Sequence, residues 1–72
     1  MFRLKIFGER MKAVRNSRNI TQQQMADDLK VSKSRISELE HAKTETNFTN
    51  LVKIADFLDV STDYLLGRTD KK

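Results

Sequence analysis

The sequence predicts an all-α fold, a compact bundle of five helices within a single domain. Proline is absent from the 72 residues and glycine occurs only at positions 8 and 67, so few residues interrupt a helix. Apolar residues recur at helical spacing and nowhere alternate strictly with polar ones between turn residues, which argues against strands. Residues 1–67 therefore form the expected domain, and the polar residues 68–72 form a tail with no reason to be ordered.

The first helix is expected over residues 4–18. Its apolar face carries Leu4, Phe7, Met11 and Val14. This spacing places the four side chains on one side of a helix, where they can reach a core. Asn19 can end the helix, because asparagine tolerates the left-handed conformation that a helix C-terminus needs.

Two short helices follow, joined by a tight turn around Lys30 and Val31. Thr21 and Gln24 have the spacing of a capping box, and Ser32 is the next N-cap. The expected inward residues are Met25, Ala26 and Leu29 in the second helix, and Ile36, Leu39 and Ala42 in the third. Because each apolar stripe is short, this stretch predicts two helices rather than one long one.

The last two helices complete the expected core. Asn47 or Thr46 caps the fourth helix, and Ser61 caps a short fifth helix that Gly67 ends. The expected core residues are Phe48, Leu51, Ile54, Ala55 and Leu58 in the fourth helix, Val60 in the joint, and Tyr64, Leu65 and Leu66 in the fifth.

The third helix presents a continuous polar face. Placing Ile36 and Leu39 inward leaves mostly short polar side chains on the opposite side. This outward face consists of Lys33, Ser34, Ser37, Glu38 and His41. Such a helix can enter the major groove of DNA, while the N-terminus of the second helix, with Gln22, can meet a phosphate through free N–H groups. A solvated face on an ordinary helical bundle has the same pattern, so spacing alone leaves both interpretations open.

The positive charge of the chain is concentrated at its N-terminus. The formal net charge is +4 and the sequence pI is about 9.7, which raises the expectation of a nucleic-acid partner only modestly. Residues 1–20 carry a charge of +5, residues 21–46 carry −1, and residues 47–72 are neutral. The two helices that could meet DNA therefore bring no net positive charge of their own.

Composition argues against a membrane protein, a metal site and an enzyme. Cysteine is absent, and the apolar runs are too short to span a bilayer. The sequence has no HExxH motif, glycine-rich phosphate loop or paired carboxylates, and its single histidine, His41, is expected at a helix end or in solvent rather than as a base. A chain of this size is also expected to lack room for a pocket of several hundred Å³. We therefore expect no catalytic residue, no metal and no cofactor.

Much of the chain resembles the Cro/repressor-type helix-turn-helix proteins, the XRE family. The resemblance rests on "ITQQQMADDLKVSKSRISELEHAK", preceded by "GERMKAVRNSRN" and followed by "NLVKIADFLDVSTDYLLG", and it covers residues 7–67. It implies a lambda-repressor-like DNA-binding fold in which the second and third helices form the helix-turn-helix unit. A member of this family is expected in the cytoplasm of a bacterial host cell, without a membrane.

The resemblance also implies roles for particular residues. Base-facing residues would be Ser32, Lys33, Ser34, Ser37 and Glu38, and phosphate contacts would come from Gln22, Arg35 and Lys43. Gln22 would also buttress the third helix. Arg15 and Glu40 match an internal ion pair between the first helix and the end of the third, and breaking one side of it is expected to destabilise the domain.

The chain departs from the family pattern in three places. Lysine stands at position 30 and asparagine at position 19, where glycine is common in the family. A left-handed conformation costs lysine about 1 kcal/mol, so the turn at Lys30 is expected to differ slightly. Glu38 on the outward face can accept from cytosine N4 but is unfavourable near phosphates, so DNA binding is expected to be weak.

Two functions from different classes follow from the resemblance. The first is a transcriptional regulator, such as a phage Cro protein, that binds a double-stranded operator as a homodimer reading two half-sites. The second is a modulator of repression, or antirepressor, that pairs with a cognate repressor protein and masks its DNA-reading surface. Both belong to a phage-type genetic switch, and the first is the favoured interpretation.

Overall fold

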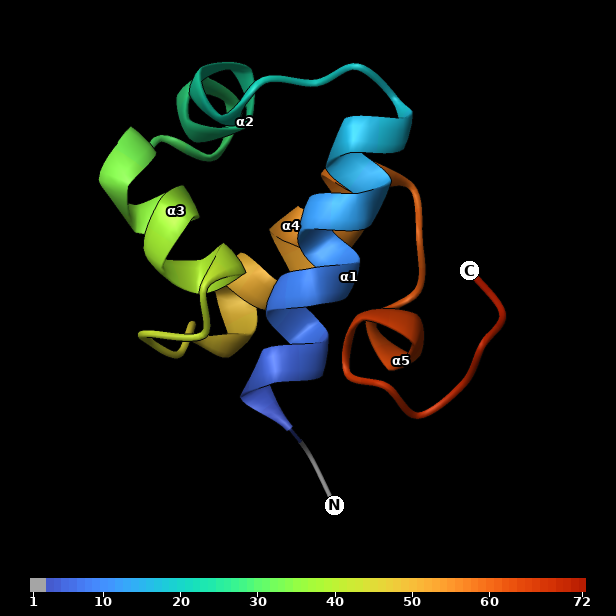
Figure 1. The fold of residues 1–72 in the computed structure, drawn as a ribbon. Coiled ribbons are helices and arrows are strands. Elements are labelled where there is room, and N and C mark those ends of the chain that lie inside the picture. Colours follow the sequence, from blue (N-terminus) through green and yellow to red (C-terminus); the bar gives the residue numbers. More distant parts are fainter. Residues whose placement is uncertain (1–2) are drawn as a thin grey trace.

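The computed structural model describes residues 3–72, in which five α-helices and no strand occur (Figure 1). The helices are α1 (Leu4–Ser17), α2 (Gln22–Leu29), α3 (Lys33–Glu40), α4 (Phe48–Leu58) and α5 (Thr62–Leu65). The predicted all-α fold is confirmed over this range, and the first two residues of the predicted domain lie outside it. None of the described helices is long and apolar enough to cross a membrane.

Helix α1 is the central element of the bundle. It packs against α3, α4 and α5, while α2 packs against α3 and α4. In Figure 1, α2 and α3 lie on one side of α1 and α5 lies on the other. The α2–α3 pair is thus supported from behind by the bundle and keeps its other side exposed.

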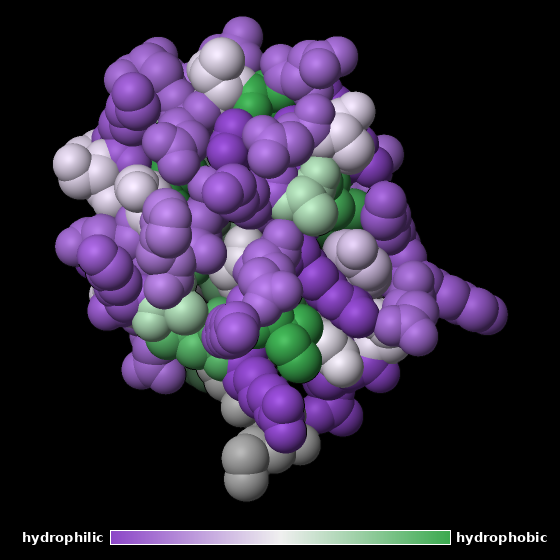
Figure 2. Space-filling view, in the orientation of Figure 1, coloured by the Kyte–Doolittle hydropathy of each residue, from purple (hydrophilic) through white to green (hydrophobic). Residues whose placement is uncertain are grey.

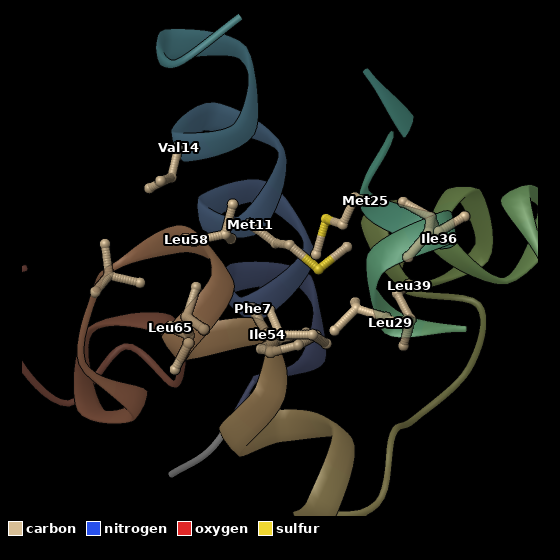
Figure 3. Close-up of a cluster of buried hydrophobic side chains, with 13 residues drawn as sticks. Phe7, Met11, Val14, Met25, Leu29, Ile36, Leu39, Ile54, Leu58 and Leu65 are labelled. Carbon is tan, nitrogen blue, oxygen red and sulfur yellow. The ribbon is translucent and has the colours of Figure 1, made fainter. Parts of the chain in front are cut away.

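A single hydrophobic core fills the space between the helices (Figure 3). Its fully buried large side chains include Phe7, Met11, Met25, Ile36, Ile54, Leu58 and Leu65, so all five helices contribute. The unbranched thioether side chains of the two methionines are suited to filling irregular gaps between helices. Most of the inward residues predicted from helical spacing are confirmed.

Phe48 is the clear exception, because it was predicted in the core and is 88% exposed. It is the first residue of α4, directly after the N-cap Asn47. The apolar stripe of α4 runs past the edge of the core at this end, and Leu51, one turn later, is only half-buried. Helical spacing shows on which side of a helix a residue lies, but it does not show how far along that side the core extends.

Polar side chains define the start of four helices. The side chains of Thr21, Ser32, Asn47 and Ser61 each accept a hydrogen bond from the backbone N–H three residues later. At Thr21 the capping box is complete, because the Gln24 side chain accepts from the Thr21 N–H at 2.8 Å. The fourth helix is capped by Asn47 and not by Thr46.

All five helices end in the same way, with a residue of positive φ after the last turn. These residues are Asn19, Lys30, Ala42, Asp59 and Gly67. The following N–H in each case bonds to a carbonyl five positions earlier, as in Schellman motifs. Ala42 was predicted to point inward, but α3 ends at Glu40 and the left-handed turn leaves Ala42 half-buried.

The turn at Lys30 keeps the left-handed backbone, with φ 59° and ψ 43°. The expected change in turn geometry is therefore not found. Lys30 adopts the conformation that glycine takes most easily. The turn keeps its usual geometry, and the lysine backbone bears the conformational free energy of the left-handed region.

Residues 68–72 lie against the bundle, although their polar composition gave no reason to expect order. Arg10 of α1 donates to the carbonyl oxygens of Tyr64 and Thr69, and its guanidinium lies 3.0 Å from Asp70 Oδ1. The same guanidinium stacks over the Tyr64 ring at 4.4 Å from its centroid. The bond from Arg10 to the carbonyl of Thr69 holds the tail. Amino-acid composition does not predict a contact to a backbone carbonyl.

An open groove lies between the N-terminal end of α1, the loop before α4 and the end of α5. Its volume is about 580 Å³. The residues around it include Leu4, Phe7, Thr46, Phe48, Leu51 and Leu66. The expectation that a chain of this size has no pocket of several hundred Å³ is wrong. The groove is open at the surface, so a small domain can form it without enclosing it on all sides.

Candidate nucleic-acid interface

The joint between α2 and α3 fixes where α3 begins. After the left-handed residue Lys30, the N–H of Val31 bonds to the carbonyl of Ala26 at 3.0 Å and closes α2. The Ser32 hydroxyl oxygen then accepts from the Arg35 N–H at 3.0 Å and opens α3. Because both helix ends are closed by specific hydrogen bonds, the direction of α3 relative to α2 is well defined.

The outward face of α3 is available to a partner. Lys33, Ser34, Glu38 and His41 are exposed, and Ser37 is half-buried. On the opposite side, Ile36 and Leu39 are buried against the core, at 0% and 2% exposure. The predicted division of α3 into a polar outward side and an apolar inward side is thus present in the structure.

A buried ion pair ties α1 to the end of α3. Arg15 Nε lies 2.6 Å from Glu40 Oε2, and Arg15 Nη2 lies 3.1 Å from Glu40 Oε1. The remaining guanidinium nitrogen, Nη1, donates to the carbonyl of Ile20 at 2.8 Å. Both residues of the pair are more than nine-tenths buried, and the parallel, two-bond geometry is the strong form of such a contact. The predicted partners are therefore in contact, and they fix the C-terminal end of α3.

Gln22 extends this network to the start of α2. Its side-chain Nε2 donates to Glu40 Oε1 at 3.0 Å, so one carboxylate receives bonds from both α1 and α2. This contact buttresses α3 from the position expected for Gln22. One N–H of the amide is used by Glu40, which leaves the second N–H and the backbone N–H of Gln22 free to meet a phosphate.

Gly8 is a positioning residue that the sequence analysis did not single out. A Cβ atom at this position would lie 2.6 Å from the carbonyl oxygens of both Leu39 and Glu40. Glycine thus lets the backbone of α1 approach the last turn of α3 directly. The available signal was a glycine inside an otherwise regular apolar stripe, which often marks a close backbone approach.

Arg35 and Lys43, the predicted phosphate contacts, flank the outward face. Arg35 is half-buried, and its Nη2 donates to the carbonyl of Glu45 at 3.4 Å, in the loop that leads to α4. The backbone N–H of Lys43 bonds to the carbonyl of Glu38 at 2.9 Å, and its side chain is exposed. Two cations therefore lie beside α3, one near its start and one just beyond its end.

His41 closes the C-terminal end of α3. Its Nδ1 lies 2.8 Å from the carbonyl oxygen of Ser37, and the ring is exposed. The same carbonyl oxygen also accepts the backbone N–H of His41 at 3.0 Å, so a donated ring N–H would be its second hydrogen bond. The position agrees with the expected structural role, and within residues 3–72 no group of three acidic or histidine side chains is placed to hold a metal ion.

Part of the N-terminal positive charge is used inside the molecule. Arg15 is paired with Glu40, and Arg10 is held by the tail. The exposed cations of the segment are Arg3, Lys5, Lys12 and Arg18. The +5 of residues 1–20 therefore overstates the charge that this segment can offer to a partner.

Comparison with known proteins agrees with this geometry. The family model described as helix-turn-helix matches residues 11–65. The chain is 41% identical over 64 residues to the SPbeta prophage-derived HTH-type transcriptional regulator YonR of Bacillus subtilis, covering 89% of this chain and 59% of YonR. It is 42% identical over 60 residues to the phage CTXphi transcriptional repressor RstR of Vibrio cholerae, covering 83% of this chain and 54% of RstR. The chain thus spans somewhat more than half the length of these relatives.

Solved structures share the fold. The P22 c2 repressor, solved in complex with a synthetic operator, superposes with a TM-score of 0.80 and 38% identity over 83% of this chain and 91% of that one. The restriction-modification controller protein C.AhdI of Aeromonas hydrophila has a TM-score of 0.79 at 24% identity, over 86% of this chain and 94% of that one, which supports the fold alone. The chain therefore belongs to the helix-turn-helix family, in its Cro/repressor-type (XRE) branch.

Proposed function

We propose that this chain is a transcriptional regulator that binds operator DNA through α3. The observation that carries the proposal is the rigid presentation of the outward face. The Ser32 cap fixes the start of α3, and the network of Arg15, Gln22 and Glu40 fixes its end. A reading helix needs such support, because hydrogen bonds to base edges tolerate little misplacement.

The residues of the outward face have the chemistry for base contacts. The proposed base-facing residues are Ser32, Lys33, Ser34, Ser37 and Glu38. Lysine can donate to guanine O6 and N7, glutamate can accept from cytosine N4, and serine can do either. The Ser32 oxygen already accepts from the Arg35 N–H, but its hydroxyl hydrogen remains free to donate.

The proposed phosphate contacts are Gln22, Arg35 and Lys43. Gln22 lies in the first turn of α2, where unpaired backbone N–H groups and the helix dipole favour an anion. Arg35 and Lys43 add positive charge on either side of the outward face. These contacts position the helix on the duplex, and the base-facing residues supply the discrimination.

The relatives suggest the biological setting. YonR carries the name of a prophage-derived regulator, RstR that of a phage transcriptional repressor, and the P22 c2 repressor was solved with operator DNA. We infer that the present chain acts in a phage-type genetic switch in the bacterial cytoplasm, as a homodimer on two half-sites. Adjacent half-sites are about 34 Å apart, one helical turn.

A second candidate function is that of a modulator that masks a repressor. One observation favours it: Glu38 is exposed on the outward face, and residues 21–46 carry a net charge of −1. An acidic surface of this kind complements the basic DNA-reading helix of another protein. The relatives YonR and RstR are named as a transcriptional regulator and a transcriptional repressor, so DNA remains the first candidate partner.

Selection from a pool of random duplexes tests the proposal. The chain is incubated with the pool, bound duplexes are amplified over several rounds, and the enriched duplex is compared with a scrambled one by fluorescence anisotropy. We expect an enriched sequence that the chain prefers over the scrambled duplex by about 1,000-fold or less, below the usual range for strong regulators. Enrichment of no sequence, together with binding of the scrambled duplex at equal strength, would contradict operator binding.

A further inference from the structure

We propose that DNA binding by this chain is coupled to the uptake of one proton by His41, whose Nε2 then donates to a phosphate oxygen. The inference deepens the proposed function and rests on it, since it needs DNA at the outward face of α3. His41 is the only histidine among the 72 residues, and cysteine is absent. It is therefore the one side chain that ordinarily changes charge between about pH 5 and 8.

A hydrogen bond to a backbone carbonyl determines which ring nitrogen of His41 is free. Nδ1 lies 2.8 Å from the carbonyl oxygen of Ser37, whereas the Ser37 hydroxyl is more distant at 3.5 Å. A carbonyl oxygen can only accept, so Nδ1 carries the hydrogen in this contact. In the neutral ring, Nε2 then has a lone pair and no hydrogen. The proton gained on titration must therefore go to Nε2, the nitrogen that is left for a partner.

The protonation state of Nε2 determines how the ring meets a phosphate. Phosphate oxygens are acceptors with negative charge, so they are repelled by the lone pair of an unprotonated Nε2. After protonation, Nε2 donates a charge-assisted hydrogen bond, which is stronger than a neutral one. DNA therefore favours the protonated ring, and the protonated ring favours DNA binding by the same factor.

The position of His41 suits a phosphate better than a base. It directly follows Glu40, the last residue of α3, and its ring is exposed. In helix-turn-helix proteins the N-terminal residues of the reading helix contact base edges. The opposite end of α3 is therefore expected to adjoin the DNA backbone, beside the proposed phosphate contact Lys43. Figure 2 shows that hydrophilic side chains dominate the viewed surface, with hydrophobic ones in small islands, so polar contacts are the main kind that this surface offers.

Charged groups of both signs surround the end of α3. The exposed ones are Lys5, Glu9 and Lys12, on either side of Gly8 in α1, Glu38 on α3, and Lys43 and Glu45 in the following loop. The buried Glu40 carboxylate is paired with Arg15. At the other end of α3 lie Lys33 and Arg35 of its first turn and Asp27 and Asp28 of α2. Three exposed cations and three exposed carboxylates balance each other near His41, so DNA phosphates are the main charge that binding brings to the ring.

The added charge is large relative to the charge of the reading unit. Residues 21–46 carry a net charge of −1 with His41 neutral, so protonation brings this segment to zero. One proton per chain can change the affinity by at most about tenfold per pH unit. Because His41 is exposed, a smaller effect is expected. DNA should bind about three- to tenfold more tightly at about pH 5.5 than at about pH 7.5.

Anisotropy titrations of the whole chain with a scrambled duplex test the inference, at about pH 5.5, 6.5 and 7.5 and at constant salt concentration. A scrambled duplex is sufficient, because every duplex offers phosphates. His41→Gln is the matched control, since glutamine stays neutral and should remove the dependence on pH that His41 causes. This variant keeps the terminal amine, which also titrates near this range, so its residual pH dependence gives the contribution of that group. His41→Lys should bind more tightly than His41→Gln at every pH, because its charge is permanent.

Nuclear magnetic resonance observes the proton at its site. The chain has a single imidazole, so its ring signals can be followed through a pH titration without ambiguity. The midpoint of that titration should move to higher pH when an excess of scrambled duplex is added. Circular dichroism at about pH 5.5 verifies that the parent and both variants are folded.

The outcomes separate the inference from the proposed function. Equal pH dependence in the parent and in His41→Gln, or a midpoint that the duplex leaves unchanged, would overturn the proton uptake. Affinity that falls as the pH falls would also overturn it, because an unprotonated Nε2 would then accept from a base amino group. If the chain still selects an enriched duplex in these cases, the proposed function stands. A chain that binds no duplex at any of these pH values overturns the function, and the inference with it.

Discussion

At the scale of single residues, the left-handed conformation of Lys30 makes a prediction about stability. This conformation costs a residue with a Cβ atom about 1–2 kcal/mol. Glycine relieves that cost but adds about 0.4–1 kcal/mol of unfolded-state entropy. Lys30→Gly should therefore raise the free energy of unfolding by about 0.5 kcal/mol. Urea denaturation of this variant can be compared with that of Lys12→Gly, at an exposed position inside α1, which should lose about 1 kcal/mol. A loss of stability in Lys30→Gly would show that the lysine side chain makes a compensating contact.

The two cations at the start of α3 have different proposed tasks, and DNA binding can separate them. Lys33 lies on the outward face, so Lys33→Ala should reduce discrimination between the enriched and the scrambled duplex, by about 1–3 kcal/mol if the contact is to a base. Arg35 lies at the edge of that face and is proposed to contact a phosphate. Arg35→Ala should weaken binding to both duplexes alike. Anisotropy titrations on the two duplexes measure both effects, and equal losses for Lys33→Ala would count against base reading.

At the scale of helices, Gly8 determines how closely α1 and α3 approach. At an exposed helix position, replacing glycine with alanine stabilises a protein by about 0.5–1 kcal/mol. Here the new Cβ would lie 2.6 Å from two backbone carbonyl oxygens of α3, so one helix must move. We predict that Gly8→Ala instead lowers the free energy of unfolding by about 1–3 kcal/mol, as overpacking does. Guanidinium denaturation gives the sign directly, and a stabilised variant would rule out the close packing.

The ion pair between α1 and α3 makes a second prediction at this scale. Glu40→Ala removes the carboxylate and leaves Arg15 buried without its partner, which should cost about 3–5 kcal/mol of stability. Replacing both residues, as in Arg15→Met with Glu40→Leu, removes the unpaired charge and should recover much of that loss. Thermal melts of the single and double variants check this. Similar stability in the single variant and the parent would mean that water or Ile20 satisfies the arginine.

The sequence predicted the helices well because their boundaries are set locally. Thr21, Ser32 and Ser61 cap helices through their own side chains, and the inward residues follow helical spacing within each element. The prediction that Phe48 is buried was wrong, because its exposure depends on where other helices end. Gly8 shows the same limit, since only the tertiary structure reveals that the carbonyls of α3 lie opposite it.

The features of the candidate site also differ in whether local spacing predicts them. The outward face of α3 follows from periodicity, which any amphipathic helix would show. Arg15 and Glu40 are 25 residues apart in the sequence, so helical spacing could not predict their pairing. The resemblance to the helix-turn-helix family predicted it. The resemblance also indicated that Gln22 buttresses α3, but only the structure shows that it does so by donating to the same Glu40 carboxylate that Arg15 contacts.

At the scale of the whole molecule, the distribution of charge is expected to limit how strongly the proposed DNA partner is bound. Arg15 and Arg10 are engaged internally, and the helix-turn-helix segment, residues 21–46, has a net charge of −1. Exposed acids such as Asp27, Asp28 and Glu38 repel phosphates. If α3 binds DNA as proposed, the favourable electrostatic part of binding is therefore expected to rest on few side chains, chiefly Arg35 and Lys43.

This limit can be measured from the dependence of DNA affinity on salt. Each neutralised phosphate contributes about −0.9 to the slope of log K against log salt concentration, so two or three contacts give about −2 to −3 for each bound chain. Glu38→Lys should steepen that slope by about one and strengthen binding to scrambled duplex, because it exchanges a repelling charge for an attracting one beside the backbone. The same substitution should reduce preference for the enriched duplex if Glu38 accepts from cytosine. Titrations at about 50 and 200 mM salt give the slopes. A slope near zero for the parent would mean that the outward face does not approach phosphates and would favour a protein partner, whose desolvated interface resists salt.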